Sequence, residues 1–237
     1  MAATFDALLE VQDHDTRLDQ IRHRIESLPE RAEVTAGARR LGELDDAIEA
    51  RSATRAEIVR DQRRLEDEIE SIGEKRKQVE ATLYSGSVSN ARELQDLQEE
   101  SEALGRRITH LEDRDLELME KLEPVDAELE VLNRTRTAEQ ERLDAAGVRL
   151  TTAEAELQVE LDRVSAERDE VVQKVPAELL SQYEKLRSGL GGIGVARLVG
   201  SQCGGCHLTL SAMEVARIRK NRDEITNCEE CGRLLVV

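Results

Sequence analysis

Aromatic residues are scarce in this sequence: 237 residues include one Phe, two Tyr and no Trp. Because a globular domain of this size normally buries aromatic side chains, we expect most of the chain to form no thick core. No stretch of 18 apolar residues occurs, which excludes a membrane-spanning helix and predicts no membrane association. The first residues have neither a basic region nor a continuous apolar run, so they do not resemble a signal peptide.

Charged residues make up 36% of the sequence, which is also rich in Ala, Leu, Glu and Arg. This composition is typical of long helices that bury a narrow apolar seam, so we expect a mainly α fold. The net charge of −17 is uneven: residues 196–237 contain six basic and five acidic residues, which leaves −18 for residues 1–195. The acidic part is expected to repel nucleic acid.

Apolar residues recur every 3.5 positions on average along two long stretches, and this repeat predicts a coiled coil. The repeat is interrupted at Pro29, which cannot donate a helical hydrogen bond. One seam of the first stretch contains Leu44, Ile58, Leu65, Ile72 and Val79. One seam of the second contains Leu94, Ile108, Leu122, Leu129, Leu143, Leu150, Leu157, Val164 and Val171.

A turn near residues 84–90 separates the two stretches. Gly86 lies among serines there, and Asn90 followed by Glu93 predicts the N-cap of a new helix. Because the two arms have similar lengths, we expect residues 1–175 to fold into a long antiparallel coiled-coil hairpin. A parallel dimer and two separate coiled coils are the alternatives.

Two further expectations follow from pairing the arms about Ser87. Pro29 and Gly147 then lie at a similar height, which suggests a bend or hinge there. Arg55 and Asp115 occupy seam positions near the same height, and they would form an ion pair that fixes the register. Alternatively, both side chains extend to water.

Residues 176–194 are expected to form a short helix and a Gly-rich linker. The linker contains the pattern G-x-G-x-x-G at Gly189, Gly191 and Gly194. A dinucleotide-binding fingerprint follows a strand and opens a helix. This pattern follows a helix and precedes an expected strand, so we interpret it as a connection.

All four cysteines lie in two Cys-x-x-Cys pairs, 21 residues apart: Cys203, Cys206, Cys228 and Cys231. Four sulfur ligands in a tetrahedron suit one Zn²⁺, and a shell closed by four cysteines indicates a structural ion rather than a catalytic one. Two disulfides are the alternative, but they would require an oxidising compartment. With every cysteine in one cluster, the cytoplasm is the expected location.

Short strands flank the two cysteine pairs, so residues 195–237 are expected to form a C4 zinc ribbon. Ser211 and Glu214 form a capping box that opens a helix between the pairs. A module this small lacks a sufficient core of its own, so zinc is expected to supply much of its folding energy.

Two stretches resemble a known family: residues 83–98 at the turn, and residues 200–235 with both cysteine pairs. The chain resembles bacterial C4-type zinc-ribbon proteins that have a RING-like zinc module and an N-terminal coiled-coil hairpin. It departs from their pattern at Ala91, where relatives often have Pro, and at Val236, where an aromatic residue is usual. The resemblance implies a non-enzymatic adaptor or chaperone with a transcription- or secretion-related protein partner, and at least one relative is linked to mRNA.

The turn of the hairpin contains the candidate partner-binding residues Tyr84, Val88 and Asn90. Exposed aromatic residues often anchor protein partners. The alternative is that Tyr84 covers the last layer of the seam. The four histidines are scattered and no nucleophile–base pattern occurs, so we expect neither an enzyme nor a small-molecule substrate.

Nucleic-acid binding through the ribbon is the alternative function. Four basic residues cluster near the end of the expected ribbon helix: Arg217, Arg219, Lys220 and Arg222. They would contact phosphates. The competing interpretation is that they complement the dipole at the C-terminal end of that helix.

Overall fold

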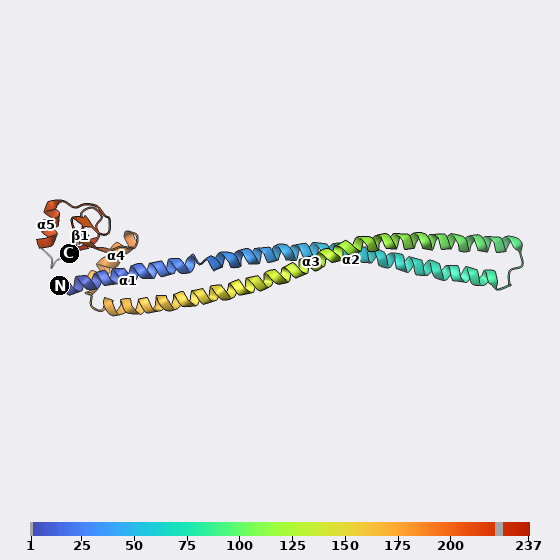
Figure 1. The fold of residues 1–237 in the computed structure, drawn as a ribbon, viewed down its shortest axis with the longest axis horizontal. Helices are drawn as coiled ribbons and strands as arrows, with labels where there is room; N and C mark the ends of the chain where they lie inside the picture. Colours follow the sequence, from blue (N-terminus) through green and yellow to red (C-terminus); the bar gives the residue numbers. More distant parts are fainter. Residues whose placement is uncertain (1, 221–224) are drawn as a thin grey trace. The chain divides into compact units, whose positions relative to one another are not determined.

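The computed structural model describes residues 2–220 and 225–237, and these residues form five helices and four short strands (Figure 1). The elements are α1 (Ala2–Glu26), α2 (Pro29–Tyr84), α3 (Ala91–Val172), α4 (Ala177–Gly189), β1 (Val195–Val199), β2 (Gln202–Cys203), α5 (Ala212–Lys220), β3 (Thr226–Asn227) and β4 (Leu234–Val236). The chain divides into two compact units, residues 1–32 with 146–237 and residues 33–145. Among the described helices, none is long and apolar enough to cross a membrane.

Residues 33–145 form an antiparallel pair of helices, which confirms the predicted hairpin. The seam residues Leu41, Leu65 and Val79 of α2 are buried, as are Leu111 and Val125 of α3. Ion pairs flank this seam: Arg51 with Glu128, Arg107 with Glu68, and Arg136 with Asp45. These side chains are about half exposed, so each pair contributes at most about 1 kcal/mol. The apolar seam, rather than the ion pairs, therefore holds the arms together.

The predicted ion pair between Arg55 and Asp115 is wrong. Arg55 Nε donates to Asp126 Oδ1 at 2.6 Å, whereas Asp115 accepts a hydrogen bond of 3.4 Å from Gln62. Gln62 lies about two helical turns beyond Arg55 along α2. The error is one of axial register, because a heptad repeat identifies the buried face of each arm but not which layers of the two arms meet.

The arms approach each other closely at Gly37, which is buried in α2. A Cβ atom at this position would lie 3.2 Å from Leu143 Cδ1 and 3.7 Å from Glu139 Oε1. The buried Glu139 carboxylate accepts a 2.7 Å hydrogen bond from Arg40 Nε, and this bond holds the pKa of Glu139 below its usual value. The missing side chain of Gly37 thus makes room for the buried Glu139 carboxylate, whose partner Arg40 is about half exposed.

We expect Gly37→Leu to destabilise the hairpin by about 1–3 kcal/mol, because the added side chain must push Leu143 and Glu139 aside. Urea denaturation followed by circular dichroism measures this loss. Gly42→Leu is the matched control, since a Cβ atom at Gly42 would meet nothing within 4 Å. The control should be neutral or slightly stabilising, because Leu favours helix over Gly. Equal losses in both variants would contradict the close approach.

The first arm is interrupted where the sequence predicted. Helix α1 ends at Glu26 and α2 begins at Pro29, whose missing N–H is not needed at the first helical position. Arg31 Nε donates to the carbonyl of Ile25 at 3.0 Å and bridges the interruption. Helix α3 continues through Gly147 without interruption. A hinge at this height therefore stays a hypothesis.

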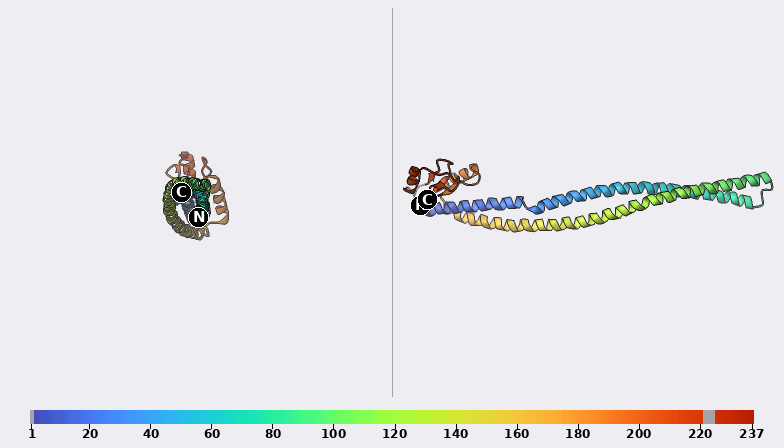
Figure 2. Two further views of the ribbon diagram at one scale, coloured as in Figure 1. Left: turned by 90° about the vertical axis from the view of Figure 1, so that its right-hand side faces the viewer. Right: turned by 45° about the horizontal axis from the view of Figure 1, so that its top comes forward.

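In the other unit, α1 packs against the end of α3, α4 and the sheet (Figure 2). The strand order is β2-β1-β4-β3, and β1 and β4 pair in parallel with Val195 opposite Leu234. The largest buried cluster joins residues from both ends of the sequence: Phe5, Ala7, Leu8, Val11, Val171, Val175, Tyr183, Val195, Leu234 and Val236. The zinc-binding module is thus attached to α1 by an apolar core.

Candidate metal centre and its supporting contacts

The four cysteines come together in one cluster. Their sulfur atoms all lie within 4.8 Å of one another, and the Sγ atoms of Cys203 and Cys231 are 3.9 Å apart. Zinc–sulfur bonds of about 2.3 Å in a tetrahedron place the sulfurs about 3.8 Å apart, so this donor set fits one Zn²⁺. The structure has all four as free thiols rather than as the two disulfides that the sequence left open.

The two cysteine turns share one backbone design. The carbonyl of Cys203 accepts from His207 N–H at 2.8 Å, and the carbonyl of Cys228 accepts from Gly232 N–H at 2.8 Å. His207 and Gly232 both have positive φ, 60° and 77°. In each turn the fifth residue therefore adopts the left-handed conformation and closes a loop that places two sulfurs side by side. His207 is the exposed counterpart of Gly232, and the cluster of possible metal ligands does not include it.

The two thiols of the second cysteine turn have pKa values shifted in opposite directions. Burial raises the pKa of the Cys228 thiol to about 12. Burial also acts to raise the pKa of Cys231, but hydrogen bonds from the backbone and side chain of Arg233 help to bring that pKa down to about 7. Zinc requires thiolates, so loading the site releases protons. When bound, zinc supplies a fixed cross-link between the two turns.

Helix α5 packs on the metal centre. Its N-terminus is capped as predicted: the Ser211 hydroxyl oxygen accepts from Glu214 N–H at 3.1 Å. The buried Glu214 carboxylate accepts from Glu229 N–H at 3.4 Å and so connects α5 to the second cysteine turn. Val215 and Ile218 pack into the same cluster as the two buried cysteines.

Two of the three basic residues of α5 already have partners within the ribbon. Arg217 forms an ion pair with Glu229 at 3.2 Å, and Arg219 donates to the carbonyl of Gly200 at 2.8 Å. Lys220 is the last residue of the helix. Arg222, the fourth basic residue that the sequence singled out, lies outside the described residues.

A buried polar cluster lies beside the ribbon, made of Asp15, Arg168, Tyr183 and Arg187; we call it the Asp15 cluster. Asp15 Oδ1 accepts from Arg168 Nε at 2.7 Å, and Asp15 Oδ2 accepts from the Tyr183 hydroxyl at 2.7 Å. Arg187 lies against the same carboxylate, with its Nε 3.7 Å from Oδ2. Burial and the neighbouring carboxylate raise the pKa of Tyr183. Three helices, α1, α3 and α4, therefore meet at one side chain.

The Gly-rich linker is held by Gln12 of α1. The Gln12 amide donates to the carbonyl of Gly192 at 2.9 Å and accepts from Gly194 N–H at 2.7 Å. A Cβ atom on Gly194 would lie 2.7 Å from the carbonyl oxygen of Tyr183, so only glycine fits there. These contacts explain part of the G-x-G-x-x-G pattern by close packing, without a nucleotide. Neither Gln12 nor the Asp15 cluster was predicted from the sequence.

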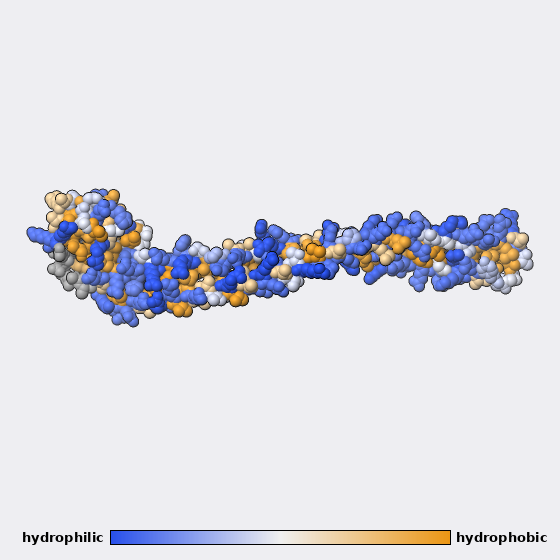
Figure 3. All heavy atoms as spheres, viewed as in Figure 1, coloured by the Kyte–Doolittle hydropathy of each residue, from blue (hydrophilic) through white to orange (hydrophobic). Residues whose placement is uncertain are grey.

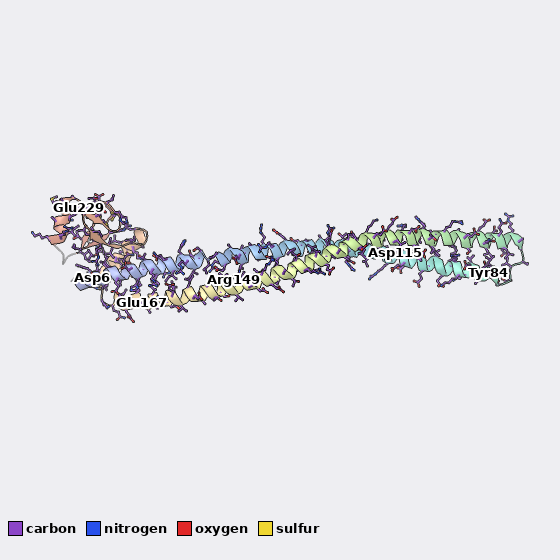
Figure 4. All side chains as sticks on the ribbon, in the orientation of Figure 1. Asp6, Tyr84, Asp115, Arg149, Glu167 and Glu229 are labelled. Carbon is purple, nitrogen blue, oxygen red and sulfur yellow. The ribbon has the colours of Figure 1, made fainter. Side chains whose placement is uncertain are left out.

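The hairpin turn is a second candidate site. Tyr84, at the end of the hairpin, is 82% exposed (Figure 4). Val88 is half-buried and Asn90 is exposed. The Asn90 side-chain oxygen accepts from Arg92 N–H at 3.0 Å, so Asn90 caps α3. Ser85 donates to the carbonyl of Thr82 at 2.8 Å and orders the start of the turn. Tyr84 extends to solvent instead of covering the last seam layer.

These features define a class: a long coiled-coil hairpin followed by a zinc ribbon with four cysteine ligands. The model of the CT398-like coiled coil hairpin domain matches residues 11–191, and the model of the C4-type zinc ribbon domain matches residues 202–235. The chain belongs to this family of hairpin proteins. The match confirms both the resemblance found in the sequence and the prediction of a ribbon that binds one zinc ion.

Relatives in bacteria cover almost the whole chain. An uncharacterised protein of Mycobacterium tuberculosis is 32% identical over 231 residues, which are 97% of this chain and 94% of the relative. One of Mycobacterium leprae is 30% identical over 230 residues, 93% and 94% of the two chains. A solved structure from Mycobacterium smegmatis has a TM-score of 0.89 at 28% identity and covers 100% of this chain and 99% of its own.

More distant structures share the fold. CT398 from Chlamydia trachomatis has a TM-score of 0.72 at 19% identity, with 98% of this chain and 97% of that chain covered. At this identity the likeness concerns the fold alone. The combination of hairpin and ribbon is therefore the property that these bacterial proteins have in common.

Proposed function

We propose that this protein is a non-enzymatic adaptor that binds a protein partner through the tip of its hairpin. The tip is defined by Tyr84, Val88 and Asn90. The observation that carries the proposal is the exposure of Tyr84, 82% of whose surface is open to solvent. The chain has only three aromatic residues, and the other two are buried in the core beside the ribbon. An aromatic residue at an exposed turn therefore suggests a contact with another molecule.

The tip has the properties of a binding element that is ordered before it binds. Tyr84 is the last residue of α2, and Asn90 caps the start of α3. Between the end of α2 and the N-cap of α3, the Ser85 and Ser87 hydroxyls are 2.6 Å apart and form a hydrogen bond. An ordered loop loses less conformational entropy on binding than a flexible one. Apolar surface is also visible at this end of the hairpin (Figure 3).

The metal centre supports a structural rather than a catalytic use of zinc. Catalytic zinc keeps one position for water or substrate, whereas four cysteine ligands fill a tetrahedral shell. Cys203 and Cys228 are also buried under the ribbon core. We therefore assign the ribbon the role of a stable module attached to α1.

Nucleic-acid binding through Arg217, Arg219 and Lys220 remains the alternative, and it has less support. Two of these three residues are engaged by Glu229 and by the Gly200 carbonyl. The part of the ribbon that the structure describes contains no Phe, Tyr or Trp side chain for stacking on bases. Binding through this surface would fall steeply with salt.

Replacing Tyr84 and Val88 with Ala should lower recovery of the protein partner about tenfold or more, because truncating an anchor residue typically costs at least about 2 kcal/mol. The measurement is affinity purification of the tagged protein from its native host, with and without RNase. Partners that persist after RNase treatment and disappear from the double variant support the adaptor.

Val131→Ala serves as the matched control, since Val131 is also an exposed apolar residue of the hairpin, at 60% exposure, but belongs to α3 far from the turn in sequence. It should recover the same partners as the unmodified protein. Undiminished recovery with the tip variant would reject the tip as the binding site. Recovery that collapses with RNase would favour the nucleic-acid alternative.

A further inference from the structure

The zinc ribbon contains a groove that neither the metal centre nor the hairpin tip uses. It has a volume of about 540 Å³ and runs between α5 and the turn at Gly200 and Ser201. Leu210 and Val215 line it from the side of the ribbon core, in which both are buried. Its wall is therefore apolar and is built on the part of the ribbon that zinc stabilises.

The groove exists because α5 presents small residues to it. Ala212 and Ala216 both line the groove and are exposed. They are four residues apart, so they lie one above the other on the same helix face. A longer side chain at either position would extend into the space. This arrangement leaves room for a side chain from another molecule.

Two exposed apolar residues are next to groove residues in the sequence, although they do not line the groove. Leu208 precedes the groove residue Thr209 and is 50% exposed, and Met213 follows Ala212 and is 82% exposed. Neither side chain belongs to an apolar cluster of buried residues. Apolar surface interrupts the hydrophilic surface of the ribbon (Figure 3). Leu208 and Met213 therefore add exposed apolar surface to the same small module as the groove.

The positive charge of Arg219 at the groove favours a partner that carries a negative charge. Arg219 is the charged residue among those that line the groove, and its bond to the Gly200 carbonyl holds it at the edge. A guanidinium has five N–H donors, so this bond leaves capacity for a carboxylate. Residues 1–195 carry a net charge of −18, whereas residues 196–237 carry +1, so the ribbon repels an acidic ligand less than the rest of the chain does.

We infer that the groove binds an acidic peptide segment of a partner protein. One apolar side chain of the segment fills the space above Ala212 and Ala216, and a neighbouring carboxylate binds Arg219. A nucleic acid fits less well, because the groove is lined mainly by apolar atoms and its lining residues include no aromatic ring. This site is separate from the hairpin tip and does not depend on the function proposed for it.

The test selects a library of random peptides of about 12 residues on the full-length, zinc-loaded protein. Peptides that combine Asp or Glu with Leu, Met or Phe should be enriched. A fluorescent copy of the most enriched peptide should bind Ala216→Gln and Arg219→Glu at least about tenfold more weakly, as measured by fluorescence anisotropy. Tyr84→Ala and Lys220→Ala should change its affinity less than about threefold.

The variants must keep the zinc content and circular dichroism of the unmodified protein, and Ala212→Gln replaces Ala216→Gln if the latter does not. No enrichment, enrichment of basic peptides, or equal binding to the groove-filling variant would overturn the inference. A labelled oligouridine that binds more tightly than any selected peptide, and that the same variants block, would assign the groove to RNA instead. Since Tyr84→Ala leaves this assay unchanged, failure at the groove is distinguishable from failure at the tip.

Discussion

Cys203→Ser is expected to abolish zinc binding and to unfold the ribbon. Cys203 is fully buried, and it supplies one of the four sulfurs that lie within 4.8 Å of one another. Structural zinc typically contributes about 10–16 kcal/mol to the folding of a small module, so losing one ligand removes most of the energy that orders this one. Bound zinc, measured by mass spectrometry of the metal, should fall from one per chain to almost none.

The loss of structure should be local. Helix α5 contains only 9 residues, whereas α2 and α3 contain 56 and 82, so circular dichroism should change little. Limited trypsin digestion is the sensitive measurement, because Arg217 and Arg219 become cleavable when α5 unfolds. His207→Asn is the control: Asn tolerates the left-handed backbone at this position and should keep the zinc. A Cys203→Ser protein with full zinc and unchanged digestion would contradict the four-cysteine site.

Asp15→Ala is expected to lower the free energy of unfolding of the unit that contains the ribbon by about 3 kcal/mol. The Asp15 side chain is 6% exposed, and its removal leaves the Arg168 and Arg187 cations without their shared acceptor. Removing one partner of a buried ion pair costs about 3 kcal/mol or more of folding free energy, because the remaining charge is still desolvated. The Tyr183 hydroxyl also loses its hydrogen-bond acceptor.

Hydrogen exchange, read by mass spectrometry, measures this loss in α1 and α4 separately from the rest of the chain. Asp19→Ala is the matched control, since Asp19 also contacts Arg187 but is 45% exposed. It should cost less than about 1 kcal/mol. Equal effects of the two substitutions would show that the Asp15 cluster contributes no more than a surface ion pair. Asp15→Asn should lie between them, because an amide oxygen still accepts from Tyr183.

Patterns that are local in sequence were predictable. The heptad repeat identified the buried seam, the spacing of the cysteines identified the zinc ligands, and Asn90 and Ser211 cap helices as expected. The seam repeat, the spacing within each cysteine pair and the two helix caps all depend on residues that are a few positions apart in the sequence. For the same reason the partner of Arg55 was predicted incorrectly, because it depends on how far one helix slides along another.

The contacts that attach the ribbon had no sequence signal. Gln12 and Asp15 lie on an amphipathic helix among other polar residues, and nothing nearby distinguishes them from solvent-exposed positions. Their partners are about 150 to 180 residues away in the sequence. The strands of the sheet have two to five residues, too few to show a periodicity from which the parallel pairing of β1 and β4 could be predicted. The groove was missed because Ala212 and Ala216 look like ordinary helix-forming residues.

The apolar core that joins α1 to β4 has a consequence for synthesis on the ribosome. Phe5 and Leu8 are synthesised long before Leu234 and Val236, which pack in the same core. At about 5–20 residues per second, the apolar face of α1 waits roughly 10 to 50 s for its covering strand. During that interval the apolar face of α1 in the nascent chain is accessible to chaperones. A protein truncated before Leu234 lacks β4, so this face of α1 stays partly uncovered. Folding of this unit therefore cannot be completed before β4 has been synthesised.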